Sequence, residues 1–346
     1  MPVRPINLLL VVLWLSLVAC SPQDDVTPTT SLELIPVKEF VFENLLTPST
    51  MDLDANGNVY IIDRKEKHIK VFSPEGHLLN TIGSAGRGPG EFTSPNSLDV
   101  QHQRIVVGDV SGRMTLFDLQ GSYISSFVVP EIRHLNSDIK LVNDSLIVIG
   151  GLVLGRDYWD GTLLHLFGVD GIKRHSFGPF SSTARRMESV ALSGAKFDFE
   201  EDMNSFWVVQ TTEYTLYNYN LDGELVDSLH LEPAYFRPLR DKEPDNGADY
   251  PDWLAAWDRP VGVFSVNDSM LVVNVQIGRS PGDEPVPSKV DVIRKRDGYL
   301  YHTFETEETL WYVDDNGHLF FKRPTTEEAV ARFSVYRLAF TSPDPN

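Results

Sequence analysis

Arginine and aromatic side chains are the residues of this chain whose types and grouping indicate a binding chemistry. A guanidinium group binds carboxylate, sulfate or phosphate through two parallel hydrogen bonds. An aromatic ring offers a flat apolar face to a sugar-like or aromatic ligand, or to a protein partner. Both types recur in connections that should meet at one end of the molecule. The candidate ligand-binding residues are Arg87, Arg133, His134, Arg156, Tyr158, Trp159, Arg185, Arg186, Arg237, Trp253, Trp257 and Arg259.

Two other interpretations of these residues stay open. The aromatic residues of segment 233–260 could simply pack that segment onto the rest of the fold. Its acidic residues could neutralise its arginines; they are Asp241, Glu243, Asp245 and Asp252.

Catalytic and metal-binding groups are harder to find. No serine lies in a G-x-S-x-G elbow, and no carboxylate pair stands out from the acidic background. Most histidines fall in or beside expected outer strands, too far from a common axis to share one metal ion: His77, His175, His230 and His302. His68 and His134 lie in loops. We therefore predict no catalytic residue and no metal ligand, and lean away from an enzyme.

Calcium remains possible because the chain has many oxygen ligands: Asp54, Asn56, Asp63, Asp109, Asp314, Asp315 and Asn316. Four of these are in Asn-Gly-type turns, where the side chain bonds the local backbone. Asp63 and Asp109 follow equivalent strands, so we interpret both as structural caps.

Charge and cysteine content exclude several classes of protein. The chain has 30 Lys and Arg against 49 Asp and Glu, a net charge of −19, which opposes binding to nucleic acid. Cys20 is the single cysteine, so the folded domain has no disulfide, Cys-based zinc site or cysteine nucleophile.

The N-terminus has the features of an export signal. Arg4 precedes an apolar run from Leu8 to Val18. The run is about 12 residues long, short of the ~20 that a spanning helix needs, so a transmembrane anchor is the weaker interpretation. Its end, Leu17-Val18-Ala19-Cys20, resembles a bacterial lipoprotein signal. The resemblance implies a signal peptide over 1–19 and a lipidated Cys20.

Residues 20–35 are rich in Ser, Thr, Pro and Asp, which predicts a flexible tether. The acidic pair Asp24-Asp25 resembles surface-export signals of some bacterial lipoproteins. The expected location is the bacterial cell envelope, lipid-anchored at the outer membrane, on the periplasmic or the surface side.

An internal repeat predicts the fold. Five times an apolar strand, a turn ending on glycine and a second apolar strand follow one another; the glycines are Gly76, Gly121, Gly171, Gly223 and Gly298. The first four recur at roughly 45 to 52 residues, the length of a propeller blade, and an insertion lengthens the last interval. No segment has a sustained helical period. We predict an all-β, six-bladed β-propeller of four-stranded blades over 36–346.

The expected blades follow this repeat along the chain. Blade 1 has strands near 50–53, 59–62, 69–72 and 78–82; blades 2 to 5 span 97–129, 139–177, 190–231 and 261–304. Blade 6 starts near Leu310 and lacks an outer strand. The segment Val37–Phe42 has no blade of its own, so we expect it to complete blade 6 and close the ring. The alternative is a loosely packed N-terminal arm.

Residues 53–63, 69–72 and 83–92 resemble the NHL-type repeat and the bacterial six-bladed β-propeller lipoproteins. Blades 1 and 2 match best. The Gly-rich segment 83–92 precedes a turn and a strand, not the helix of a nucleotide-binding loop, so we interpret it as a blade-to-blade link with Phe92 filling the wedge.

Strand direction alternates within a blade, so the loops divide between two faces. Links from an outer strand to the next blade and loops between the two middle strands share what we call the top face, which receives the candidate binding residues together with Arg64 and Lys65. The remaining turns, on the bottom face, are acidic.

We therefore expect a lipid-anchored, monomeric propeller that binds or presents a small acidic or sugar-like ligand, or an envelope protein, at its top. The alternatives are a divalent-metal-dependent enzyme, lactonase-like or lyase-like, and a structural subunit of an envelope complex.

Overall fold

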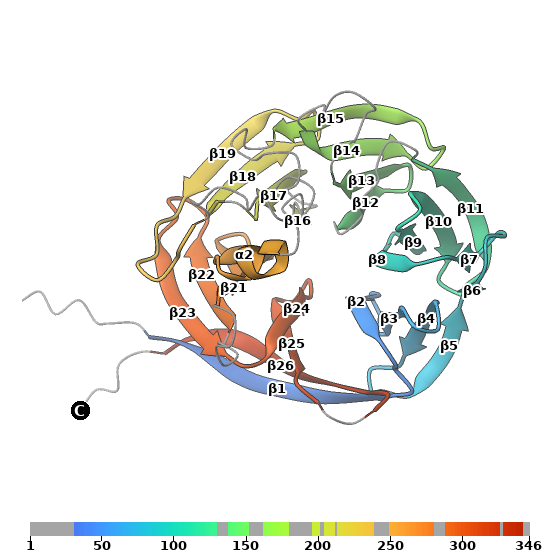
Figure 1. Cartoon of the computed structure of the whole chain (residues 1–346), viewed down its shortest axis with the longest axis horizontal. Helices are drawn as coiled ribbons and strands as arrows, with labels where there is room; N and C mark the ends of the chain where they lie inside the picture. The colour runs from blue at the N-terminus through green and yellow to red at the C-terminus, as the bar shows by residue number, and fades with distance from the viewer. Residues whose placement is uncertain are drawn as a thin grey trace, which may run out of the picture.

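The computed structural model describes residues 31–129, 138–151, 162–179, 196–200, 204–211, 213–238, 249–279, 288–325 and 328–341. Within them, six antiparallel four-stranded sheets are arranged as blades around a central axis (Figure 1). The predicted six-bladed β-propeller is therefore confirmed. No helix in these described ranges is long and apolar enough to cross a membrane.

In blades 1 to 5 the strands run outward from the axis in chain order, and in blade 6 the first strand of the chain is outermost. Blade 1 contains β2 (Pro48–Leu53), β3 (Val59–Asp63), β4 (His68–Phe72) and β5 (Leu78–Ile82). Blade 2 contains β8 (Pro95–Gln101), β9 (Arg104–Asp109), β10 (Arg113–Asp118) and β11 (Tyr123–Val128). Blade 3 contains β12 (Ile139–Asn143), β13 (Leu146–Gly150), β14 (Thr162–Gly168) and β15 (Lys173–Pro179).

The second half of the ring repeats this order. Blade 4 contains β16 (Lys196–Glu200), β17 (Ser205–Val209), β18 (Thr215–Asn220) and β19 (Leu225–His230). Blade 5 contains β20 (Arg259–Asn267), β21 (Met270–Gln276), β22 (Ser288–Arg294) and β23 (Leu300–Thr306). Blade 6 contains β24 (Thr309–Val313), β25 (His318–Arg323), β26 (Val330–Thr341) and, outermost, β1 (Ser31–Glu43).

The N-terminal strand closes the ring, as the sequence predicts. β1 pairs antiparallel with β26, from Ser31 opposite Thr341 to Glu43 opposite Val330. The strand starts earlier than the expected tether boundary at residue 35, because Leu32 and Leu34 alternate with polar residues and pack on the core between blades 5 and 6. The remainder of the expected signal and tether, residues 1–30 with Cys20, lies outside the described residues.

The core is divided into six apolar clusters, one between each pair of neighbouring blades. The wedge between blades 1 and 2 contains Phe92, which is 1% exposed and packs against Phe117. The link around it forms the short parallel pair β6 (Ser84–Ala85) and β7 (Glu91–Phe92). The predicted role of Phe92 as a wedge is confirmed.

The repeated turn glycines are required by two physical constraints. All five have φ between 71° and 88°, the left-handed region. At Gly171 and Gly223, an added Cβ would also lie 2.7 Å from the Cβ of Phe127 and Phe177 respectively, on the preceding blade. The turn therefore fits beneath its neighbour only without a side chain.

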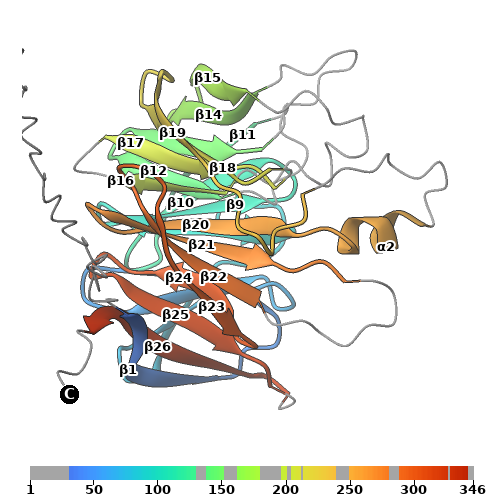
Figure 2. The ribbon, with the colours of Figure 1, turned by 90° about the vertical axis from the view of Figure 1, so that its left-hand side faces the viewer.

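The two faces of the ring differ in what projects from them. The insertion between blades 4 and 5 carries the short helix α2 (Tyr250–Ala255) on the top face, close to the axis in Figure 1 and projecting sideways in Figure 2. β1 begins, and β26 ends, on the opposite side (Figure 2). The first described residue, Ser31, therefore lies on the bottom face.

Candidate functional site

The inner strands place one side chain each at an equivalent level of the central channel. These six positions are equivalent by strand register: in every blade, the residue is paired with a residue at a similar position of the blade's second strand. They are also linked from blade to blade: an Asp52 oxygen accepts the Val100 amide at 2.7 Å, and Asp99 accepts the Leu141 amide at 2.8 Å. The resulting channel ring consists of Asp52, Asp99, Lys140, Asp198, Phe264 and Tyr312.

Lys140 is the only cation among these six residues. Its ammonium group lies 3.3 Å from Asp99 and 3.5 Å from Asp198. Burial by itself would lower the pKa of Lys140, but the surrounding carboxylates, led by Asp99 and Asp198, raise it well above its ordinary value. Lys140 is therefore a permanent positive charge in the centre of the ring.

Asp52 has a different environment from the other two carboxylates. Its oxygens accept the amides of Val100 and Leu53, and it shares a hydrogen bond with the Tyr312 hydroxyl. In the described part of the chain, no Lys, Arg or His forms an ion pair with Asp52. Burial, followed by the negative charge of Asp99, raises the pKa of Asp52 to about 7. Near neutral pH this carboxyl group is therefore partly protonated.

The channel ring separates two pockets. Asp52, Lys140, Asp198, Tyr312 and Val313 line both of them, so they form the partition. The top pocket has a volume of about 410 Å³ and is formed by the first halves of the inner strands. The bottom pocket, about 370 Å³, is formed by their second halves and by the acidic residues Asp99, Glu200, Asp268, Asp314 and Asp315.

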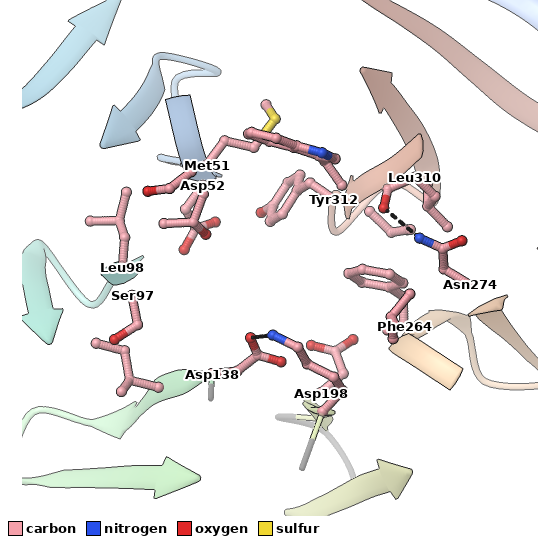
Figure 3. A pocket seen from close by; sticks show the side chains of 18 of the residues that line it. Met51, Asp52, Ser97, Leu98, Asp138, Asp198, Phe264, Asn274, Leu310 and Tyr312 are labelled. Atoms are coloured by element: carbon pink, nitrogen blue, oxygen red, sulfur yellow. Dashed lines mark hydrogen bonds and ion pairs between the residues drawn. The ribbon is translucent and has the colours of Figure 1, made fainter. Parts of the chain in front are cut away.

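The top pocket combines apolar rings with polar groups (Figure 3). Phe197, Phe264, Trp311 and Tyr312 supply the rings. Four buried polar atoms of its lining residues have no hydrogen-bond partner: Ser49 Oγ, Asn96 Oδ1, Ser97 Oγ and Asn274 Oδ1. Such an atom costs about 1–3 kcal/mol when it stays unpaired, so a ligand or water that bonds it is stabilised.

Ion pairs neutralise nearly all the charged groups around the top pocket. Asp138 and Lys196 pair with each other at 2.8 Å, and Asp198 pairs with Lys140. Arg64, in the loop after β3, is exposed at the rim and its guanidinium forms no ion pair with any residue in the described ranges. The pocket thus has an unpaired cation at its rim and a protonatable carboxyl group at its floor.

The predicted binding residues that the structure describes lie away from this pocket. Arg87 is exposed on the link between blades 1 and 2, beside a smaller hollow. Arg237 pairs with the buried Asp258 at 3.2 Å, and Arg259 donates to Gln276 at 2.9 Å. Trp253 and Trp257 are half-buried on the insertion. The remaining candidates lie outside the described residues: Arg133, His134, Arg156, Tyr158, Trp159, Arg185 and Arg186.

Part of the insertion is held by an ion pair within it and by hydrogen bonds to blade 5. Asp258 accepts the amides of Arg237 and Gly278, at 2.8 and 2.7 Å. Asp291, fully buried in β22, accepts the hydroxyl groups of Tyr214, Tyr235 and Thr303. Arg237 therefore has a structural partner, but Asp258 is not among the four acidic residues that the sequence offered as partners for the arginines of the insertion.

The structural interpretation of the acidic turn residues agrees with their contacts. Asp63 accepts the amides of Leu46 and Thr47, and Asp109 accepts those of Thr93 and Ser94. The histidines at 175, 230 and 302 are in outer strands, as expected. Among the described residues, no group of three or more His, Cys, Asp or Glu could hold a metal ion.

The channel ring is the feature that the sequence analysis missed. Its signal is present in the sequence as a polar residue between apolar neighbours in the inner strands: Met51-Asp52-Leu53, Leu98-Asp99-Val100, Ile139-Lys140-Leu141 and Phe197-Asp198-Phe199. A charged residue within an otherwise buried strand indicates either a partner or a water-filled channel.

Comparisons with known proteins support a bacterial β-propeller. Residues 43–139 match a family model described as "6-bladed beta-propeller". No curated protein matches the sequence. A crystal structure of a DUF4221 family member from Bacteroides vulgatus is similar, with a TM-score of 0.68 at 13% identity over 90% of this chain and all of that one.

Two further structures have the same fold at similar identity. A predicted exported protein from Bacteroides fragilis has a TM-score of 0.57 at 12% identity, covering 91% of this chain and 96% of its own. A catalytically inactive histidine-to-alanine variant of virginiamycin B lyase from Staphylococcus aureus, with quinupristin, has a TM-score of 0.50 at 13% identity, covering 89% and 88%. At these identities the comparisons define the fold alone.

Proposed function

We propose that this protein is an exported, membrane-anchored β-propeller that binds a small acidic or sugar-like ligand in the top pocket of its channel. The observation that carries the proposal is the pocket itself: it ends at the channel ring, and Ser97 and Asn274 in its wall are at least 95% buried with unpaired polar atoms. Ligand sites are typically concave and mostly apolar, with a few polar groups that orient the ligand.

Binding fits the residues of the pocket better than a metal-dependent reaction does. The carboxylates of Asp99 and Asp198 already neutralise Lys140, which occupies the position between them that a cation would need.

Export and anchoring rest on the N-terminal sequence. The structure is compatible with a tether because Ser31, the first described residue, lies on the bottom face. The top pocket would then face away from the membrane and be accessible to soluble ligands. Replacement of Cys20 by Ser should move the protein from the membrane fraction to the soluble fraction and abolish incorporation of labelled palmitate; an unchanged distribution would contradict lipidation.

Thermal unfolding of the full-length chain in detergent tests ligand binding. A ligand that binds only the native state raises Tm, and the rise grows with the ratio of free ligand concentration to Kd. We expect acidic sugars or small organic acids to raise Tm, and we expect the rise to be smaller for Asn274→Ala. A shift caused by calcium or zinc and reversed by EDTA would instead favour the metal-dependent enzyme, and no shift with any compound would contradict a small-molecule site.

A further inference from the structure

The charges around the top pocket indicate the orientation of the ligand, if the proposed function is correct. We infer that the ligand is a hydroxylated carboxylic acid, such as an acidic sugar, with its carboxylate at Arg64 on the rim and its uncharged hydroxyl end at the floor beside Asp52 and Tyr312.

The rim is the part of the pocket where a negatively charged group is attracted most strongly. Of the charged residues that line the pocket, Asp138 pairs with Lys196 and Asp198 pairs with Lys140. Arg64 is the remaining cation, and no residue in the described ranges pairs with its side chain. A carboxylate on the ligand can form the bidentate contact that a guanidinium favours.

The floor disfavours an anion for the opposite reason. The channel ring contains three carboxyl groups and a single ammonium group, so an added negative charge there would be repelled. The floor does offer neutral hydrogen bonding, because Asp52 and the Tyr312 hydroxyl both line the pocket there and share a hydrogen bond. Hydroxyl groups can both donate and accept, so they match such a floor without a charge.

The wall between rim and floor suits a ring with hydroxyl substituents. Trp311 and Phe264 come from neighbouring blades 6 and 5 and both line the pocket. Their faces can pack on the C–H surface of a sugar ring while its hydroxyl groups point elsewhere.

The test compares two sugars that differ at one carbon. D-galacturonate has a carboxylate where D-galactose has a hydroxymethyl group, and titration calorimetry with the full-length chain measures both affinities. We expect wild type to bind galacturonate about tenfold more tightly. Arg64→Ala should remove this preference and leave the galactose affinity within about twofold. Arg87→Ala, which removes an exposed arginine outside the pocket, is the matched control and should change neither.

A second variant tests the floor. Tyr312→Phe should weaken both sugars alike, by about threefold, because both place a hydroxyl group beside the Tyr312 hydroxyl. Equal affinities of wild type for the two sugars, or a loss of galactose binding in Arg64→Ala, would overturn the orientation while leaving a small-molecule site in place. Absence of binding by both sugars would overturn the inferred ligand class, and the broader thermal panel then decides whether the proposed function fails too. Far-ultraviolet circular dichroism and Tm confirm that each variant is folded.

Discussion

At the scale of single residues, the inner-strand aspartates combine a structural contact with a channel contact. One oxygen of Asp99 accepts the Leu141 amide of the next blade while the other lies near Lys140. Asp198 does the same with the Ser265 amide and Lys140. The residues that join the blades therefore also determine the charge of the channel, so a substitution there affects stability and the pocket together.

Replacement of Asp52 by Asn should change how stability depends on pH. The pKa of Asp52 rises from an ordinary 3.8 to about 7 on folding. The folded chain holds this proton more tightly than the unfolded chain, so the contribution to stability is full below about pH 4 and is lost as pH rises through about 7. Between pH 5 and 8 the free energy of unfolding should fall by on the order of 1–3 kcal/mol more in wild type than in Asp52→Asn.

Urea unfolding at several pH values measures this difference. The raised pKa of Asp198, also caused mainly by burial, is present in both proteins, so the comparison isolates Asp52. Parallel pH profiles for the two proteins would show that Asp52 titrates normally in the folded state.

Replacement of Lys140 by Met should destabilise the protein far more than the same change at Lys196. Without Lys140, the carboxylate of Asp99, whose side chain is 3% exposed, loses its cation, and we expect a loss of about 3 kcal/mol. The partner of Lys196 is Asp138, with a 36% exposed side chain that water can solvate, so that variant should lose less than about 1 kcal/mol. Chemical denaturation at pH 7 compares them; equal losses would mean that the channel ring is well hydrated.

At the scale of elements, the blades are joined by links whose shape depends on glycine. Gly83 has φ +78°, and an added Cβ would lie 2.2 Å from a ring carbon of Phe92, the wedge between blades 1 and 2. Gly57 has a nearly identical φ of +77°, yet its nearest atom would be 3.5 Å away. Comparing substitutions at Gly57 and Gly83 therefore distinguishes the cost of backbone strain from the cost of a steric clash.

We expect Gly57→Ala to cost about 1 kcal/mol, the strain of an alanine in the left-handed region. Gly83→Ala should cost about 2 kcal/mol more, because Phe92 must move within a packed core. The free energies of unfolding from guanidinium denaturation provide the comparison. Equal costs would indicate that the Phe92 wedge is loosely packed and can shift without penalty.

At the scale of the whole molecule, the ring is closed by a strand from the other end of the chain. Phe42 of β1 is fully buried and packs with Phe72 of blade 1 and Phe333 of blade 6, at ring-centroid distances of 4.6 and 5.8 Å. It therefore connects the first and last blades through the core as well as through backbone hydrogen bonds.

Phe42→Ala should lower the free energy of unfolding by about 3–5 kcal/mol, as expected for a large aromatic residue removed from a core. The neighbouring Val41 is 40% exposed, so Val41→Ala should cost less than about 1 kcal/mol. Thermal and chemical unfolding measure both. A small loss in Phe42→Ala would show that closure depends on the strand pairing and not on the shared core.

The sequence alone determined the class of fold, the number of blades and the closing strand, because these depend on local patterns. Each of these signals depends on a single blade or on its neighbour. They are alternating apolar residues, glycines with positive φ and a strand without a blade of its own, Val37–Phe42. It did not reveal the pocket. Asp52, Asp99, Lys140 and Asp198 are up to 146 residues apart, and each looks like an isolated polar residue in its own strand. Only closure of the ring brings them to one level, where burial and mutual charge decide which group is paired, which is protonated and where a ligand can bind.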